Sequence, residues 1–170
     1  MAHINRKKGH LSLLPVVALL IALTAPWNAA ADTFYPAGCD FKVTFPGQAK
    51  VYTNKNKYFS WEKADYADNV SFLTAECLPS SFDQSGMEAA MTAHAEAVRG
   101  YGHYLSQKHS GVAEGRFYRD VGGIKAVVIQ KAYKGQTSTL LVMAMCESSK
   151  YPNKVTEDFF KSVAGRIVPF

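Results

Sequence analysis

The chain has 170 residues, of which 48% are hydrophobic and 19% are charged. That balance excludes an intrinsically disordered chain, and the length suits one globular core rather than two. Three cysteines are too few for a fold built on disulfides, and 12 glycines with 7 prolines give no fibrous or low-complexity bias. The sequence therefore predicts one ordinary globular domain.

The first 31 residues have the three-part pattern of an export signal. A basic start at residues 6–8 precedes an apolar run over residues 11–25, and three alanines follow at 29–31. The apolar run is about 15 residues long, shorter than the roughly 20 that span a bilayer. We therefore expect cleavage after Ala31, a single domain over residues 32–170, a periplasmic or secreted location and no stable membrane insertion of the mature protein.

Cys39 leaves one alternative to simple cleavage. Ala37 and Gly38 are small residues of the kind that precede a lipid-modified cysteine. Cys39 lies well beyond the apolar run, however, and Pro36 stands where a leucine is usual. Cleavage without lipid attachment is the preferred interpretation.

Cleavage would also change the charge of the chain. The export segment holds three basic residues and no acidic ones, so the mature protein would carry 16 basic and 14 acidic residues, a net charge of +2. So small a surplus gives no electrostatic reason to expect a nucleic acid partner. The one local basic group contains Lys50, Lys55 and Lys57 with Tyr52 and Tyr58, and it is typical of a solvated hairpin whose lysines discourage edge pairing.

The mature chain begins with strand patterns. Phe41, Val43 and Phe45 alternate with polar or charged residues and end at a Pro-Gly pair, which predicts a strand with one buried face and a hairpin after it. Further strands are expected over residues 49–53, 58–66 and 70–77. We expect these four strands to form a meander.

A helical period follows the meander. Apolar side chains recur at intervals of three and four from Met87 to Leu105, and Ser85 and Glu88 have the spacing of a capping box. The pattern predicts a helix over about residues 86–99, frayed beyond that point because glycines at 100 and 102 weaken it.

Three more strands and a second helix complete the pattern. The strands are expected over residues 112–121, 124–134 and 137–147, and the helix from residue 153 to about 165. The last strand has no polar residue from Leu140 to Met145, which is typical of a strand covered on both faces. The predicted fold class is α+β, a predominantly antiparallel sheet of six or seven strands flanked by two helices.

Three short motifs accompany this order of elements. They are residues 41–47 (FKVTFPG), with Lys50 and Val51 after them, residues 75–79 (AECLP) and residues 159–163 (FFKSV). With the order of elements, they make the chain resemble the PsbP-like α/β/α sandwich family, named for an extrinsic photosystem II subunit and found in many small bacterial envelope proteins. The resemblance implies a noncatalytic accessory or binding protein, and it brings no catalytic residue and no cofactor to this chain. The extra cysteines depart from the plainest members.

Catalytic motifs occur only as fragments. Residues 94–96 match half of a zinc deaminase signature, but the cysteine half is missing. His94, His103 and His109 do not have the spacing of metal ligands, and the sequence lacks the common nucleophile, zinc-protease and phosphate-loop motifs. We therefore expect no enzyme activity and no bound metal, and we expect His94 to be a buried or half-buried residue with one ring nitrogen hydrogen-bonded.

The cysteines predict one disulfide rather than a reactive nucleophile, because an exported protein meets an oxidising environment. In a meander, Cys39 and Cys77 lie at the same end of the sheet, and Cys146 at the close of the last strand is expected to reach that end too. Three pairings are possible. The shorter loop favours Cys39–Cys77, Cys77–Cys146 is the alternative, and one thiol is left over.

The predicted function is that of an exported, noncatalytic binding protein that acts through contacts with an envelope protein. The alternatives are a carrier of a small ligand between sheet and helix, and an enzyme with cysteine or histidine chemistry. Phe59 and Trp61 are expected to pack inward, which leaves Tyr58, with Tyr52 and Lys57, as the predicted contact surface. The competing interpretation is that these are ordinary exposed tyrosines.

Overall fold

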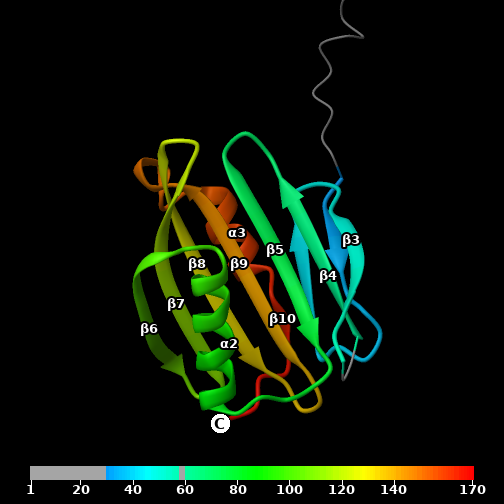
Figure 1. Ribbon diagram of the computed structural model, residues 1–170. Helices are drawn as coiled ribbons and strands as arrows, with labels where there is room; N and C mark the ends of the chain where they lie inside the picture. Colours follow the sequence, from blue (N-terminus) through cyan, green and yellow to red (C-terminus); the bar gives the residue numbers. More distant parts are fainter. Residues whose placement is uncertain (1–29, 58–59) are drawn as a thin grey trace, which may run out of the picture.

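The main sheet of the protein has seven antiparallel strands in the order β3-β4-β5-β9-β8-β7-β6 (Figure 1). The structure is a computed structural model that describes residues 30–57 and 60–170. The strands of the main sheet are β3 (Lys50–Lys55), β4 (Ser60–Ala67), β5 (Ser71–Leu78), β6 (Tyr101–His109), β7 (Val112–Val121), β8 (Ile124–Lys134) and β9 (Thr139–Glu147).

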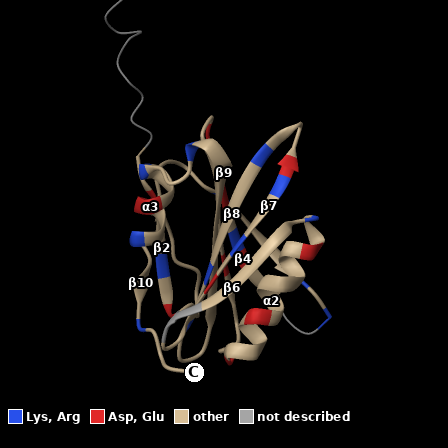
Figure 2. Ribbon diagram, turned by 90° about the vertical axis from the view of Figure 1, so that its left-hand side faces the viewer, with Lys and Arg blue, Asp and Glu red and all other residues tan. Residues whose placement is uncertain are grey.

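One layer lies on each face of this sheet (Figure 2). The first face carries helix α2 (Gln84–Ala97), which contacts β6, β7 and β8. The opposite face carries α3 (Lys154–Lys161), the 3₁₀ turn η1 (Ser148–Lys150) and a small sheet. The small sheet consists of β1 (Asp32–Phe34), β2 (Phe41–Phe45) and β10 (Ala164–Gly165), in the order β1-β2-β10. The predicted α+β sandwich of antiparallel strands and two helices is confirmed.

Strand β9 is covered on both faces, as its unbroken apolar run predicts. Leu140, Val142 and Ala144 are buried toward the small sheet and α3. The alternate residues Leu141, Met143 and Met145 pack on the α2 side. A strand has a period of two residues, so one continuous apolar run supplies both layers.

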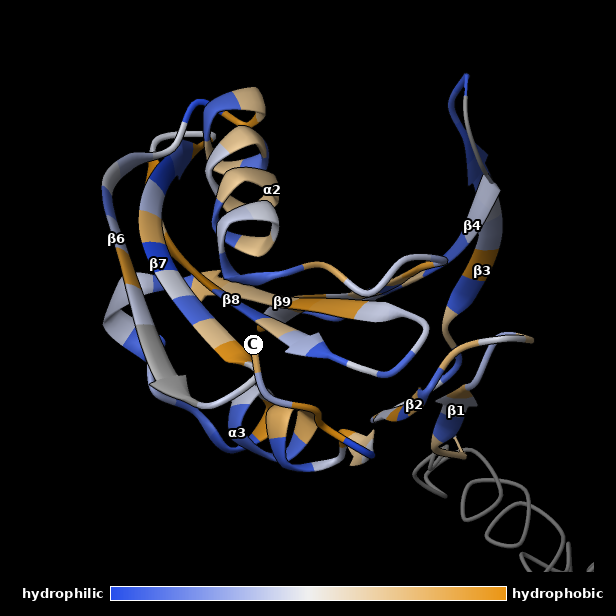
Figure 3. Cartoon of the chain, turned by 90° about the horizontal axis from the view of Figure 1, so that it is seen from below, coloured by the Kyte–Doolittle hydropathy of each residue, from blue (hydrophilic) through white to orange (hydrophobic). Residues whose placement is uncertain are grey.

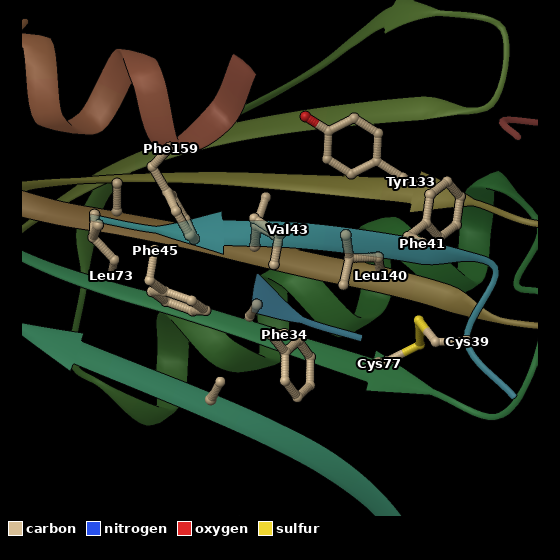
Figure 4. Close-up of a cluster of buried hydrophobic side chains, with 14 of the residues drawn as sticks. Phe34, Cys39, Phe41, Val43, Phe45, Leu73, Cys77, Tyr133, Leu140 and Phe159 are labelled. Carbon is tan, nitrogen blue, oxygen red and sulfur yellow. A yellow bond between two sulfur atoms is a disulfide. The ribbon is translucent and has the colours of Figure 1, made fainter. Parts of the chain in front are cut away.

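The largest core cluster fills the space between the main sheet, β2 and α3 (Figure 4). Phe41, Val43 and Phe45 on β2 are almost completely buried, and the ring centroids of Phe45 and Phe159 are 5.1 Å apart. The Cys39–Cys77 disulfide lies at one end of this cluster. The β2 alternation predicted from the sequence therefore builds the main core.

The predicted meander is wrong at its first strand. Strand β2 pairs with β1 and β10 rather than with β3, so it belongs to the small sheet. The reason is burial: the apolar side of β2 stacks on the face of the main sheet, where it fills more core than it would as an edge strand. Strands β1 and β10, with three and two residues, were not predicted.

The region after α2 is also different from the prediction. Tyr101 and Leu105 belong to strand β6 rather than to a frayed helix. Helix α2 ends where Arg99, just after the C-cap residue Val98, takes a φ angle of 55° in the left-handed region. Gly100 is also required for space, since an added Cβ would lie 2.3 Å from the Phe117 ring.

Both helices begin at a capping side chain. Asp83, rather than the predicted Ser85, caps α2 by accepting a hydrogen bond of 2.8 Å from the Gly86 amide. Asn153 caps α3 through the Thr156 amide. Helix α3 is shorter than predicted because β10 follows it at residue 164.

Asp40 ties the small sheet to the β8–β9 turn. Its carboxylate accepts hydrogen bonds from the Thr137 and Ser138 amides at 2.7 and 2.9 Å, and from the Ser138 hydroxyl at 2.9 Å. Desolvation by itself would raise the pKa of Asp40, but these hydrogen bonds to the charged form outweigh it and lower the pKa. The charged carboxylate therefore clamps the two layers together.

Candidate functional site

Helix α2 covers only part of its face of the main sheet. It contacts β6, β7 and β8, while β3 and β4 turn toward the same side as the helix at the other edge (Figure 3). A half-open cavity of about 220 Å³ lies between the helix and strands β4, β5, β8 and β9. We call this cavity and the uncovered β3–β4–β5 surface beside it the groove.

The lining of the groove is part apolar and part polar. Its apolar side chains come from α2, β5 and β9, and they are Leu78, Ala90, Met91, Leu141 and Met143. Its polar side chains come from α2, β4, β5 and β8, and they are Lys63, Thr74, Glu76, His94 and Gln130. A mixture of this kind can hold an apolar group and fix its orientation through a few polar contacts.

Strand register places these side chains in two rows across the sheet. One row runs over four adjacent strands as Asp65, Thr74, Met143 and Gln130. The next row runs as Tyr52, Lys63, Glu76 and Leu141. Neighbouring strands are about 4.8 Å apart, so members of a row are close neighbours on the same face.

His94 joins α2 to the floor of the groove. Its Nδ1 lies 3.0 Å from Nε2 of Gln130, which is 5% exposed. Burial lowers the pKa of His94, and the nearby charge of Glu76 raises it. The effect of burial is the larger one, so the pKa lies below its ordinary value. The imidazole is therefore neutral at pH 7, with Nδ1 accepting the amide proton and Nε2 protonated. The predicted half-buried histidine with one satisfied nitrogen is confirmed.

A charged network forms the rim of the groove on β3 and β4. The Tyr52 hydroxyl donates to Asp65 Oδ2, and Lys63 Nζ lies 3.5 Å from Asp65 Oδ1 and 5.7 Å from the Tyr52 ring centroid. Burial alone would lower the pKa of Lys63, but the attraction of Asp65 and the Tyr52 contact raise it overall. Burial and the bond to Asp65 raise the pKa of Tyr52. Lys63 therefore stays charged and Tyr52 stays neutral at pH 7.

Trp61 completes the rim, which corrects the expectation that it packs into the core. Its indole Nε1 donates to Glu76 Oε1, and the side chain is half-buried on the groove face. The fully buried residue of β4 is Ala64, on the opposite face. Ala64 belongs to the main core cluster with Phe34 and Phe45, so large side chains from other elements already fill the core side of β4.

The three residues predicted as a contact surface have different positions. Tyr52 is half-buried within the rim network, and Lys57 is exposed just beyond the end of β3. Tyr58 and the neighbouring Phe59 lie outside the described residues. Thr74, Glu76, Gln130 and the groove face of Trp61 are not among the predicted site residues. Polar residues at alternate positions of the otherwise apolar β5 were the signal that could have indicated them.

The disulfide joins Cys39 and Cys77, the favoured pairing. A sulfur atom in this bond is not available for a lipid, so the structure has no place for an acylated Cys39. Cys146 is buried and free, and it pairs in register with Ser71, while Cys77 pairs with Leu140. Cys146 therefore lies at the opposite end of the sheet from Cys77, not at the same end. The unpredicted strand β6 causes this difference because it reverses the direction of every later strand.

Burial raises the pKa of the Cys146 thiol, which disfavours the thiolate. Within residues 30–57 and 60–170, no group of three histidine, cysteine or acidic side chains is placed to hold a metal ion. In the same part of the chain, no helix has both the length and the apolar character that a membrane span needs.

No protein-family model matches the chain, and no curated protein matches it. The site must therefore be interpreted from its own geometry.

Proposed function

We propose that this chain is an exported, noncatalytic binding protein of the bacterial envelope, and that it holds a segment of a partner protein in the groove. The observation that carries the proposal is the uncovered half of the main sheet beside α2. There an apolar floor, half-buried aromatic side chains and a charged rim surround an open cavity. Aromatic anchors and a polar rim are the usual composition of a protein contact surface.

Export is supported by two features besides the signal pattern. The Cys39–Cys77 disulfide suits an oxidising compartment. Strand β1 begins at Asp32, so cleavage after Ala31 would leave every described strand and helix intact. The sandwich fold and the predicted export are also what the resemblance to the PsbP-like family implies.

The size and shape of the groove favour a protein segment over a small ligand. Pockets for small molecules are usually about 300–1,000 Å³ and enclose most of the ligand. The cavity here is about 220 Å³ and half-open, and α2 leaves the neighbouring β3–β4 part of the sheet uncovered (Figure 3). It has room for one or two side chains of a longer chain that continues over the rim.

Site-specific photocrosslinking in intact cells tests this proposal. A benzoylphenylalanine at position 52 lies in the rim of the groove, and one at position 35 replaces a tyrosine that is 66% exposed just after β1. We expect a discrete protein adduct from position 52 and none from position 35. No adduct at 52, the same adduct at both positions, or a small molecule that copurifies in the groove would contradict the proposal.

A further inference from the structure

We infer that the groove recognises an arginine or lysine side chain of the partner, with Glu76 as its counter-charge. This inference rests on the proposed function, because it names the chemistry of the segment that the groove holds. Three observations carry it: the charge balance of the groove, the apolar surface beside Glu76, and the buried acceptors on the floor.

The charge balance leaves one negative charge unmatched. The charged side chains in the two rows are Lys63, Asp65 and Glu76. Lys63 forms an ion pair with Asp65 and also lies opposite Glu76 in the β4–β5 pair. One positive charge therefore interacts with two carboxylates. Glu76 accepts a hydrogen bond from the Trp61 indole, but this donor is neutral and does not cancel the charge of the carboxylate.

Among the described residues, Lys131 and Arg119 do not place a cation at Glu76. The Lys131 chain lines the cavity, but its ammonium lies 3.1 Å from Glu114 Oε2 and 5.0 Å from the Phe160 ring centroid, on the α3 face. Arg119 does not line the cavity. A cation from a partner would therefore find a net charge of −1 at this point.

The surface next to Glu76 suits the stem of a basic side chain. Leu141 is directly opposite Glu76 in the β5–β9 pair, and Leu78 is two residues further along β5 on the same face. Arginine and lysine have three or four methylenes that pack on apolar surface while the charged head contacts a carboxylate. An aliphatic side chain with no charge would bury the same surface but would leave Glu76 unmatched.

The floor supplies further acceptors for N–H groups. Thr74 and Gln130 are each 5% exposed, and both line the cavity. Within the described part of the chain, no hydrogen bond uses the Thr74 hydroxyl, and Gln130 uses its amide nitrogen for His94. Hydroxyl and carbonyl oxygens that accept hydrogen bonds match the five donors of a guanidinium group.

A pair of synthetic peptides tests this inference on the wild-type mature protein. Both peptides are capped and contain leucines around one central residue, which is arginine in the first and the neutral isostere citrulline in the second. Titration followed by ¹H–¹⁵N NMR should move amide signals over residues 74–78 and 90–94. We expect the arginine peptide to bind about tenfold more tightly, the effect of one charge-assisted contact.

Glu76→Gln should remove this preference, because the amide keeps an acceptor for Trp61 but loses the charge. Glu62→Gln is the matched control, since Glu62 lies on the same sheet but on the opposite face, outside the groove. Equal affinity of wild-type protein for both peptides, or no binding of either, would overturn the inference whether or not the Glu76 variant folds. A position-52 adduct together with equal peptide affinities would leave the proposed function standing and remove only the basic-side-chain inference.

Discussion

His94 Nδ1 lies 3.0 Å from Gln130 Nε2, and this hydrogen bond connects α2 to the floor of the groove. Met143 is directly opposite Gln130 in the β8–β9 pair, so the contact sits beside the apolar part of the lining. A protonated imidazole could not accept the amide proton at Nδ1. Protonation of His94 would therefore remove this hydrogen bond between the helix and the floor of the groove.

The first prediction concerns pH. The folded protein lowers the pKa of His94 from its ordinary 6.5 because burial disfavours the charged ring. Below pH 6.5 the unfolded chain binds this proton more readily, so the free energy of unfolding decreases as the pH falls from 6.5 toward the lowered pKa. Above 6.5 the group has no effect. Chemical denaturation at pH 7.5 and 5.5 should show this loss.

His94→Gln should flatten that pH dependence, since glutamine can still bond to Gln130 but does not titrate. The control is His103→Gln, because His103 is an exposed histidine on β6, outside the groove. A His94→Gln protein that loses as much stability as wild type between the two pH values would show that the histidine is not the sensor.

The second prediction concerns the disulfide. Cys39 and Cys77 are 38 residues apart, and closing a loop of that size stabilises a protein by about 3–4 kcal/mol in the chain-entropy model. The double change Cys39→Ser and Cys77→Ser should lower the free energy of unfolding by about that amount. Under denaturing, non-reducing conditions, thiol titration should find one free cysteine. Three free thiols would mean that the bond does not form.

The third prediction concerns Asp40. Asp40→Ala removes the acceptor for two amides and two hydroxyls, and it should lower the free energy of unfolding by about 1–3 kcal/mol. Asp120→Ala is the comparison, because Asp120 is exposed and accepts a hydrogen bond of 3.2 Å from the Tyr101 hydroxyl. Equal effects of the two changes, measured by urea denaturation, would contradict the clamp.

Local patterns predicted the strands of this protein better than their pairing. Strands β2, β7 and β8 begin and end at the predicted residues, because alternation and Gly-Gly turns are local signals. The sheet to which β2 belongs could not be predicted, because it depends on which surface buries the three β2 side chains best. Strand β6 was hidden because Tyr101 and Leu105 continue the spacing of α2, and a backbone break at Arg99 has no clear sequence signal.

The site was harder to predict than the fold. Tyr52 was recognised as a candidate, but its partners Asp65 and Lys63 are more than ten residues away and are joined to it by strand register. Trp61 was placed on the wrong face, because a large apolar residue is usually the core residue of a strand. The groove itself arises from the position of α2 on the sheet, which no residue pattern specifies.

The most direct measurement of the groove as a binding surface is to fill it. Ala90 lines the cavity, and the neighbouring Ala89 on α2 is exposed, so Ala90→Trp and Ala89→Trp are matched changes. Circular dichroism should show that both tryptophan variants are folded. Thr74→Leu provides a second change within the cavity. We predict that Ala90→Trp abolishes the protein adduct formed from position 52 and that Ala89→Trp leaves it unchanged. An adduct of equal yield in both variants would show that the partner does not occupy the groove.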